Sequence, residues 1–130
     1  MKRLIPLVPI FALLAACSTG SSLDSLRNDP ATLKAVHTFP ESYEVVYARI
    51  AKQGFLCHVA SGTLYPEQAY GQVDLINTFG IAPKYTFSAR IEKAGTGSKV
   101  TIYSGNNWVK QAYIDNIVDW ASGSTKCKAG

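Results

Sequence analysis

The stretch KYTFSARIEKAGTGSKVTIYS, residues 84–104, decides the fold class. Within residues 85–91, apolar side chains alternate with polar or charged ones, which is typical of a strand with one buried face. A glycine-containing break follows at residues 94–97, and residues 99–104 then return with Val100 and Ile102 directed inward. The stretch therefore predicts two antiparallel strands joined by a hairpin loop.

Two further strands are predicted upstream of this hairpin. Residues 68–77 form the nearer one, with Val73 and Leu75 on its buried face, and a loop over 77–83 connects it to the hairpin. Alternation over residues 55–60 predicts a first short strand, and Ser61-Gly62-Thr63 is a turn signal. The sheet is thus expected to have four strands.

A helix is predicted on each side of these strands in the sequence. Thr38 and Glu41 fit a capping box that opens the first helix, and Gly54 is expected to end it. The second helix is predicted over Val109–Ala121, with its N-cap among residues 105–107 and its end at Gly123. Four residues give the first helix its apolar stripe: Tyr43, Val46, Tyr47 and Ile50.

These elements predict an α+β domain over residues 38–130. Their order is α-β-β-β-β-α, and the short connections favour an antiparallel sheet. Two helices on one face of a four-stranded sheet make a two-layer sandwich. No repeat or second domain is expected.

The first sixteen residues have the layout of an export signal. Lys2 and Arg3 precede an apolar run over residues 4–14, which is too short to span a bilayer as a helix. Leu14-Ala15-Ala16-Cys17 resembles the lipobox of bacterial lipoproteins. The resemblance implies cleavage before Cys17 and a membrane anchor of acyl chains, such as palmitate, on that residue. The alternative is a secreted protein cut elsewhere, with Cys17 a free thiol.

Residues 17–37 are expected to form the lipidated N-terminus and a flexible tether. Ser18 follows the cysteine, and because retention in the inner membrane commonly uses Asp there, the lipoprotein resemblance implies the outer membrane, with the domain facing the periplasm. Loss of Lys2 and Arg3 leaves 11 basic against 9 acidic side chains, so the net charge falls from +4 to +2. With no basic run, nucleic acid is not an expected partner.

Once Cys17 is assigned to the lipid, two cysteines remain. Cys57 and Cys127 in an oxidising compartment predict one disulfide, and no Cys-x-x-Cys spacing supports a reactive pair. The layout also resembles small Gram-negative outer-membrane lipoproteins with one disulfide, a group without an assigned activity. Three segments carry this likeness: Leu64-Tyr65-Pro66, residues 85–93, and Trp120-Ala121-Ser122-Gly123 ahead of Cys127.

The sequence offers no set of residues that predicts catalysis. His58 is expected at the surface, while Glu67, Asp74 and Glu92 are expected as solvated carboxylates. Metal-ligand spacing, a nucleophile elbow and a phosphate-binding glycine loop are all missing from the sequence. We therefore expect no catalytic residues, no metal, no cofactor and no enzymatic activity.

Aromatic residues give the one binding signal. Tyr65, Tyr70, Tyr103 and Trp108 lie outside the clearest core positions, and Tyr70 and Tyr103 are out of phase with their buried neighbours. A sheet face with exposed tyrosines at 70 and 103 suits a partner protein or peptidoglycan. The alternative is that these rings cover sheet edges or pack under loops. We expect a lipid-anchored envelope protein that acts as a binding or adaptor module. The alternatives are an enzyme or enzyme inhibitor of cell-wall metabolism, and a structural surface component.

Overall fold

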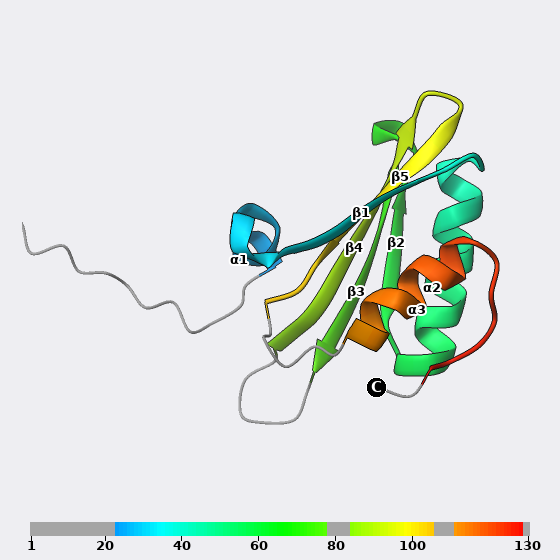
Figure 1. Ribbon diagram of the computed structural model, residues 1–130. Coiled ribbons are helices and arrows are strands. Elements are labelled where there is room, and N and C mark those ends of the chain that lie inside the picture. The colour runs from blue at the N-terminus through cyan, green and yellow to red at the C-terminus, as the bar shows by residue number, and fades with distance from the viewer. Residues whose placement is uncertain (1–22, 78–83, 106–110, 129–130) are drawn as a thin grey trace, which may run out of the picture.

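The computed structural model describes residues 23–77, 84–105 and 111–128 (Figure 1). Within these ranges the chain forms three α-helices, two short 3₁₀ helices and five strands. The elements are α1 (Leu23–Asn28), η1 (Pro30–Thr32), β1 (Leu33–Phe39), α2 (Tyr43–His58), β2 (Ser61–Tyr65), η2 (Pro66–Gln68), β3 (Tyr70–Asn77), β4 (Lys84–Ala94), β5 (Gly97–Tyr103) and α3 (Gln111–Ala121).

The five strands form one sheet in the order β1-β5-β4-β3-β2, and every neighbouring pair is antiparallel. The predicted α+β class and antiparallel sheet are therefore confirmed. The hairpin decided by residues 84–104 lies at its centre, where Ala94 pairs with Gly97 across a tight turn. Gly95 in that turn has φ of +60°, a conformation that glycine adopts without steric cost.

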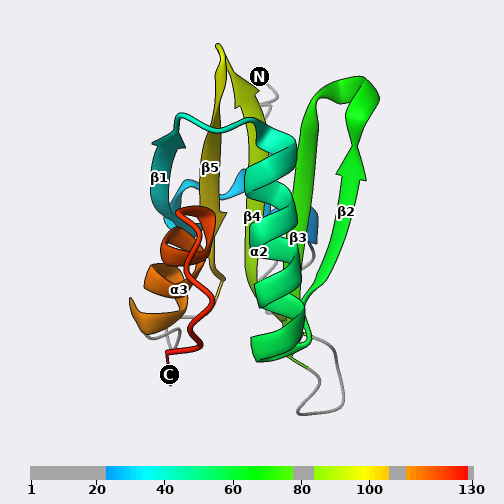
Figure 2. The same cartoon turned by 90° about the vertical axis from the view of Figure 1, so that its right-hand side faces the viewer.

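Helices α2 and α3 cover one face of the sheet (Figure 2). The hydrophobic core lies between these two helices and the sheet. Trp120 of α3 is the largest fully buried side chain, and its indole N–H donates to the Lys126 carbonyl at 2.8 Å, so its polar atom is satisfied. The core combines residues of both helices with the inward-facing residues of the central strands: Val46, Ile50, Ile117, Trp120, Val73, Phe87, Ala89, Ile91, Val100 and Ile102.

The predicted strand over residues 55–60 is wrong, because α2 continues to His58. Gly54 does not end the helix: a Cβ built there would lie 3.3 Å from Ala60 Cβ and 3.6 Å from Val73 Cγ1. A small residue thus lets the helix pack closely on the sheet. Val59 ends α2 instead, in the left-handed conformation with φ of 58°.

The sheet has five strands, not four, because both edge strands were missed. β2 occupies the segment interpreted as a turn, and β1 lies within the segment interpreted as a tether. All five residues of β2 are exposed, so its sequence shows no buried alternation. The folded domain consequently begins before Thr38, and residues 17–22 of the proposed tether lie outside the described residues.

The predicted capping box at Thr38 is also wrong. Thr38 belongs to β1 and pairs with Lys99, while Ser42 is the N-cap of α2 and its hydroxyl accepts from the Val45 N–H at 3.4 Å. Glu41 instead forms an ion pair with Arg49 at 3.2 Å.

The predicted disulfide between Cys57 and Cys127 is confirmed. It joins the end of α2 to the tail that follows α3. The tail is also held by Asn116 of α3, whose side chain donates to the Lys128 carbonyl at 3.1 Å and accepts from the Lys128 N–H at 3.0 Å. Two kinds of bond therefore fix the tail against the two helices.

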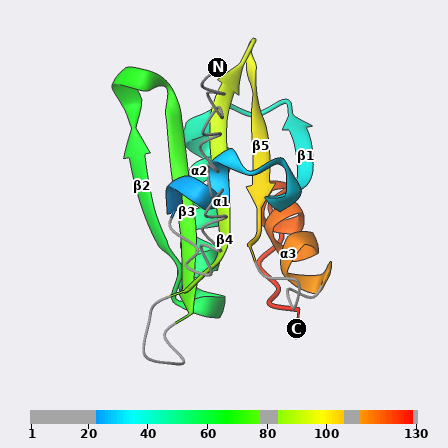
Figure 3. The same ribbon diagram turned by 90° about the vertical axis from the view of Figure 1, so that its left-hand side faces the viewer.

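A third helix, α1, lies on the opposite face of the sheet (Figure 3). Its Leu26 is 1% exposed, so this short helix is packed against the strands rather than extended into solvent. The prediction of helices on one face only is therefore wrong. None of the described helices has the length and apolar character needed to cross a membrane.

Candidate binding surface

The sheet face opposite α2 and α3, here called the outer face, carries its side chains in rows that cross the strands. Strand register defines each row, because residues paired across antiparallel strands point to the same side. One row runs from β2 to β1 through Tyr65, Tyr70, Glu92, Lys99 and Thr38. This row brings residues that are far apart in sequence into contact.

Helix α1 covers a different part of the outer face. Arg27 donates to the Ser88 hydroxyl at 3.4 Å and lies 3.6 Å from an Asp74 carboxylate oxygen. The Gln72 side-chain amide also donates to the Ser88 hydroxyl. Leu26 of α1 is buried, and so are Gln72 and Ser88 of the strands. The part of the outer face beneath α1 is thus occupied by the protein itself.

The remaining part carries an aromatic and charged group of side chains that we call the outer-face cluster: Tyr65, Tyr70, Arg90, Glu92 and Lys99. The two tyrosine rings are stacked, with centroids 4.7 Å apart and an interplanar angle of 23°. The Arg90 guanidinium lies over the Tyr70 ring, 3.9 Å from its centroid. Glu92 accepts from Arg90 at 3.5 Å and from Lys99 at 3.1 Å.

These contacts order the cluster without contributing much to stability. Exposed ion pairs contribute about 0–1 kcal/mol each, and an exposed cation–π contact about 0.5–1 kcal/mol. Tyr70, Arg90 and Glu92 nevertheless each contact two members of the cluster, and Tyr65 and Lys99 contact one each, which limits their rotamers. A partner that binds here therefore meets a surface whose side-chain entropy is already reduced.

The edge strand β2 adjoins this cluster and lacks the residue types that usually prevent an edge strand from pairing with another strand. Its five residues, Ser-Gly-Thr-Leu-Tyr, contain neither charge nor proline, although proteins commonly use both to keep an edge from pairing. The opposite edge strand, β1, carries Lys34 and His37 and is irregular between Leu33 and Ala35, whereas a proline follows each of the two strands. Within the part of the chain that the structure describes, β2 is therefore the uncharged edge, and it lies beside an aromatic surface.

The structure separates the residues that the sequence proposed as a binding face. Tyr70 lies in the outer-face cluster. Tyr103 is half-buried on the same face, but it pairs with Ser88, in the part contacted by α1. Trp108 lies outside the described residues. Tyr70 is therefore brought together with Tyr65 and Arg90 rather than with Tyr103.

The sequence placed Tyr65 outside the core without assigning it to the binding face, and Arg90 was missed. A signal for Tyr65 was present, because Pro66 and the next residues make a tight turn between Tyr65 and Tyr70, and such a turn favours a hairpin. Arg90 follows from the alternation of β4, but its position over Tyr70 depends on the register between β3 and β4.

The candidate acid–base residues do not converge. Asp74 is on the outer face, Glu67 is exposed in η2, and His58 is half-buried on the other face against Tyr113, with ring centroids 4.9 Å apart. Burial lowers the pKa of His58, and its Nε2 is buried without a hydrogen-bond partner. Within residues 23–77, 84–105 and 111–128, no three His, Cys, Asp or Glu side chains gather as metal ligands would.

Comparison of the chain with protein-family models, with curated proteins and with solved structures finds no match.

Proposed function

We propose that this chain is a lipid-anchored cell-envelope protein that acts as a binding or adaptor module. In this proposal the chain is cut before Cys17, acylated there and held on the outer membrane with its domain in the periplasm. The lipobox-like segment Leu14–Cys17 supports the anchor. The partner is an envelope protein, bound at the outer-face cluster and the adjacent edge of β2.

The free edge of β2 beside stacked tyrosines is the observation that carries this function. An extended segment of a partner can add to an exposed edge strand through main-chain hydrogen bonds, and its side chains then gain specificity from the neighbouring surface. Tyrosine and arginine are the residue types that most often dominate such interfaces. Tyr65 is 40% exposed and is the last residue of β2. It therefore belongs both to the exposed edge strand and to the outer-face cluster.

Site-specific photo-crosslinking in intact cells tests the binding surface. A photoreactive side chain replaces Thr63 of β2 in one strain and Val36 of β1 in another. Both are exposed positions on edge strands, so Val36 is a matched control. We expect a discrete protein adduct from the Thr63 probe and none from the Val36 probe. Tyr65→Ala should weaken the adduct while changing thermal stability little.

The outcomes separate the alternatives. Glycan adducts would move the proposal to peptidoglycan, and absence of any adduct at Thr63 would reject the β2 surface. The anchor is tested separately by mass spectrometry of the N-terminal peptide and by Cys17→Ser. We expect acyl chains on Cys17, and loss of membrane association in the variant; an unmodified cysteine would reject the anchor.

A further inference from the structure

A patch of exposed apolar side chains lies at the C-terminal end of α2, on the side of the sheet away from the outer-face cluster (Figure 2). Phe55, Leu56 and Val59 are 60%, 63% and 78% exposed. Single exposed apolar residues are common on protein surfaces, but three large ones within five residues form a patch that indicates contact with something apolar.

The backbone conformation of Val59 is a second observation that indicates a binding role for this patch. Val59 adopts φ of 58° and ψ of 33°, a left-handed conformation in which a β-branched residue is strained. Glycine or asparagine would end the helix there with less strain. Because Val59 is also the most exposed residue of the patch, it gains little burial within the domain in return for that strain.

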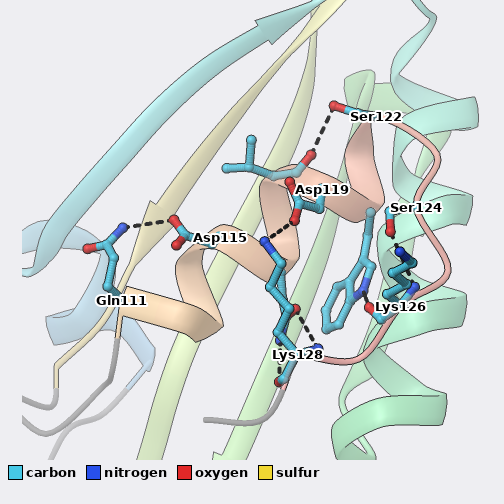
Figure 4. A network of polar contacts seen from close by, with 10 residues as sticks. Gln111, Asp115, Asp119, Ser122, Ser124, Lys126 and Lys128 are labelled. Atoms are coloured by element: carbon cyan, nitrogen blue, oxygen red, sulfur yellow. Dashed lines mark hydrogen bonds and ion pairs between the residues drawn. The ribbon is translucent and has the colours of Figure 1, made fainter.

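Basic side chains border the patch. Lys52 precedes Phe55 by one helical turn, and the Cys57–Cys127 disulfide brings Lys126 and Lys128 to the same end of α2. Among the described residues, Lys52 and Lys126 form no ion pair, whereas Lys128 pairs with Asp119 at 2.6 Å (Figure 4). Apolar side chains with a basic border fit the interface of an anionic bilayer.

The proposed anchor places such a bilayer within reach. Six peptide units separate Cys17 from Leu23, the first described residue of α1, so this connection spans at most about 20 Å. A domain held on so short a connection stays against the membrane surface. Because the connection enters α1 on the outer face, it supplies proximity, and the apolar patch with its basic border is what selects the end of the domain that meets the bilayer.

We propose that the C-terminal end of α2 rests on anionic phospholipid, with Phe55, Leu56 and Val59 in the interfacial region and Lys52 and Lys126 facing the headgroups. This proposal rests on the proposed function, because the lipid on Cys17 supplies the proximity. The contact would orient the domain on the membrane and leave the outer-face cluster, on the opposite side of the sheet, turned away from α2 and free for a partner (Figure 1).

Fluorescence quenching by lipid tests this orientation. The full-length lipidated protein is placed on vesicles of phosphatidylethanolamine and phosphatidylglycerol whose acyl chains are brominated. Phe55→Trp is compared with Val45→Trp, a control at the other, exposed end of α2. Both variants retain Trp108 and Trp120, so the difference between the two variants reports the introduced tryptophan. We expect several-fold greater quenching in Phe55→Trp, and a smaller excess when Lys52→Glu and Lys126→Glu are added.

Equal quenching in Phe55→Trp and Val45→Trp would overturn the proposal, whether solvent, a second copy or a partner protein covers the patch. The mass of the N-terminal peptide is measured on the same samples. If Cys17 carries no lipid but Phe55→Trp is still quenched by added vesicles, the anchor fails and the bilayer contact stands. If Cys17 carries lipid and quenching is equal, the bilayer contact fails and the anchor stands.

Discussion

Replacement of Gly71 by alanine tests the contact that sets α2 on the sheet. Gly71 lies on the helix-facing side of β3, paired with Ile91, and the ring of Tyr47 lies directly over it. A Cβ at this position would overlap Tyr47 Cδ2 and would lie 2.8 Å from Cγ and 3.1 Å from Cε2. Because carbon atoms in contact are normally about 3.5–4.0 Å apart, the ring must retreat by about 1 Å.

The expected loss follows from two opposing terms. Overpacking of this kind costs about 2–3 kcal/mol, whereas alanine is favoured over glycine within a strand by about 0.5–1 kcal/mol. Gly71→Ala should therefore lower the free energy of unfolding by about 1.5 kcal/mol, which corresponds to roughly 10 °C in Tm for a domain of this size. Guanidinium and thermal unfolding followed by circular dichroism, with the disulfide intact, measure both quantities.

Two controls show whether the Tyr47 ring causes the loss. In a Tyr47→Ala background, Gly71→Ala should cost less than about 0.5 kcal/mol, because Cγ, Cδ2 and Cε2 of residue 47 are gone. A Cβ at Gly62 would lie 2.8 Å from the Tyr47 hydroxyl, 3.4 Å from Tyr47 Cε2 and 3.1 Å from Ala51 Cβ. Gly62→Ala should be tolerated better than Gly71→Ala, because its shortest contact is with the far end of the Tyr47 side chain, which can move. The reasoning is refuted if Gly71→Ala costs the same in both backgrounds, or nothing in either.

Three further outcomes are expected. Replacing Cys57 and Cys127 together by serine should lower the free energy of unfolding by about 4 kcal/mol, because the disulfide closes a loop with a sequence separation of 70. Thiol labelling of the unchanged protein with and without reductant checks the disulfide, and the same labelling under both conditions would contradict it. Val59→Gly should be more stable than Val59→Ala by about 1 kcal/mol in denaturant unfolding, since glycine adopts the left-handed conformation without the Cβ penalty, and equal stability would contradict a strained helix end. Burial lowers the pKa of His58 below the ordinary histidine value of about 6.5, so the unfolded state binds more protons near that pH. Stability should therefore fall as the pH drops through this range. His58→Phe keeps an aromatic ring there and should weaken this dependence in unfolding measured from pH 7.5 to about pH 5.5; an equal dependence would assign it to another group.

Local sequence determined the centre of the fold. The alternation of residues 84–104 and the turn at Gly95 identified the hairpin, and the apolar face of residues 109–121 identified the last helix, which the structure describes over Gln111–Ala121. The pairing of Cys57 with Cys127 followed from the number of cysteines once Cys17 was set aside. These features depend on neighbours in the chain or on counting, so they were predictable without a structure.

The two edge strands and the end of α2 depend on tertiary contacts, so local sequence did not predict them. β1 and β2 are largely exposed, so they lack the alternation that reveals a half-buried strand. Gly54 reads locally as a helix stop, but close packing against Ala60 and Val73 retains it inside the helix.

The candidate binding surface was likewise decided by the tertiary structure. Tyr65, Tyr70 and Arg90 become neighbours only through the register of β2, β3 and β4. Helix α1 contacts a different part of the outer face, where its Arg27 donates to the Ser88 hydroxyl. The disulfide and the central strands were predicted correctly from the sequence alone, because each is carried by composition or by a contiguous segment, and the export signal stays a prediction of the same kind. The surface depended on contacts between segments distant in the chain, because side chains from separate strands become neighbours only when the sheet has formed.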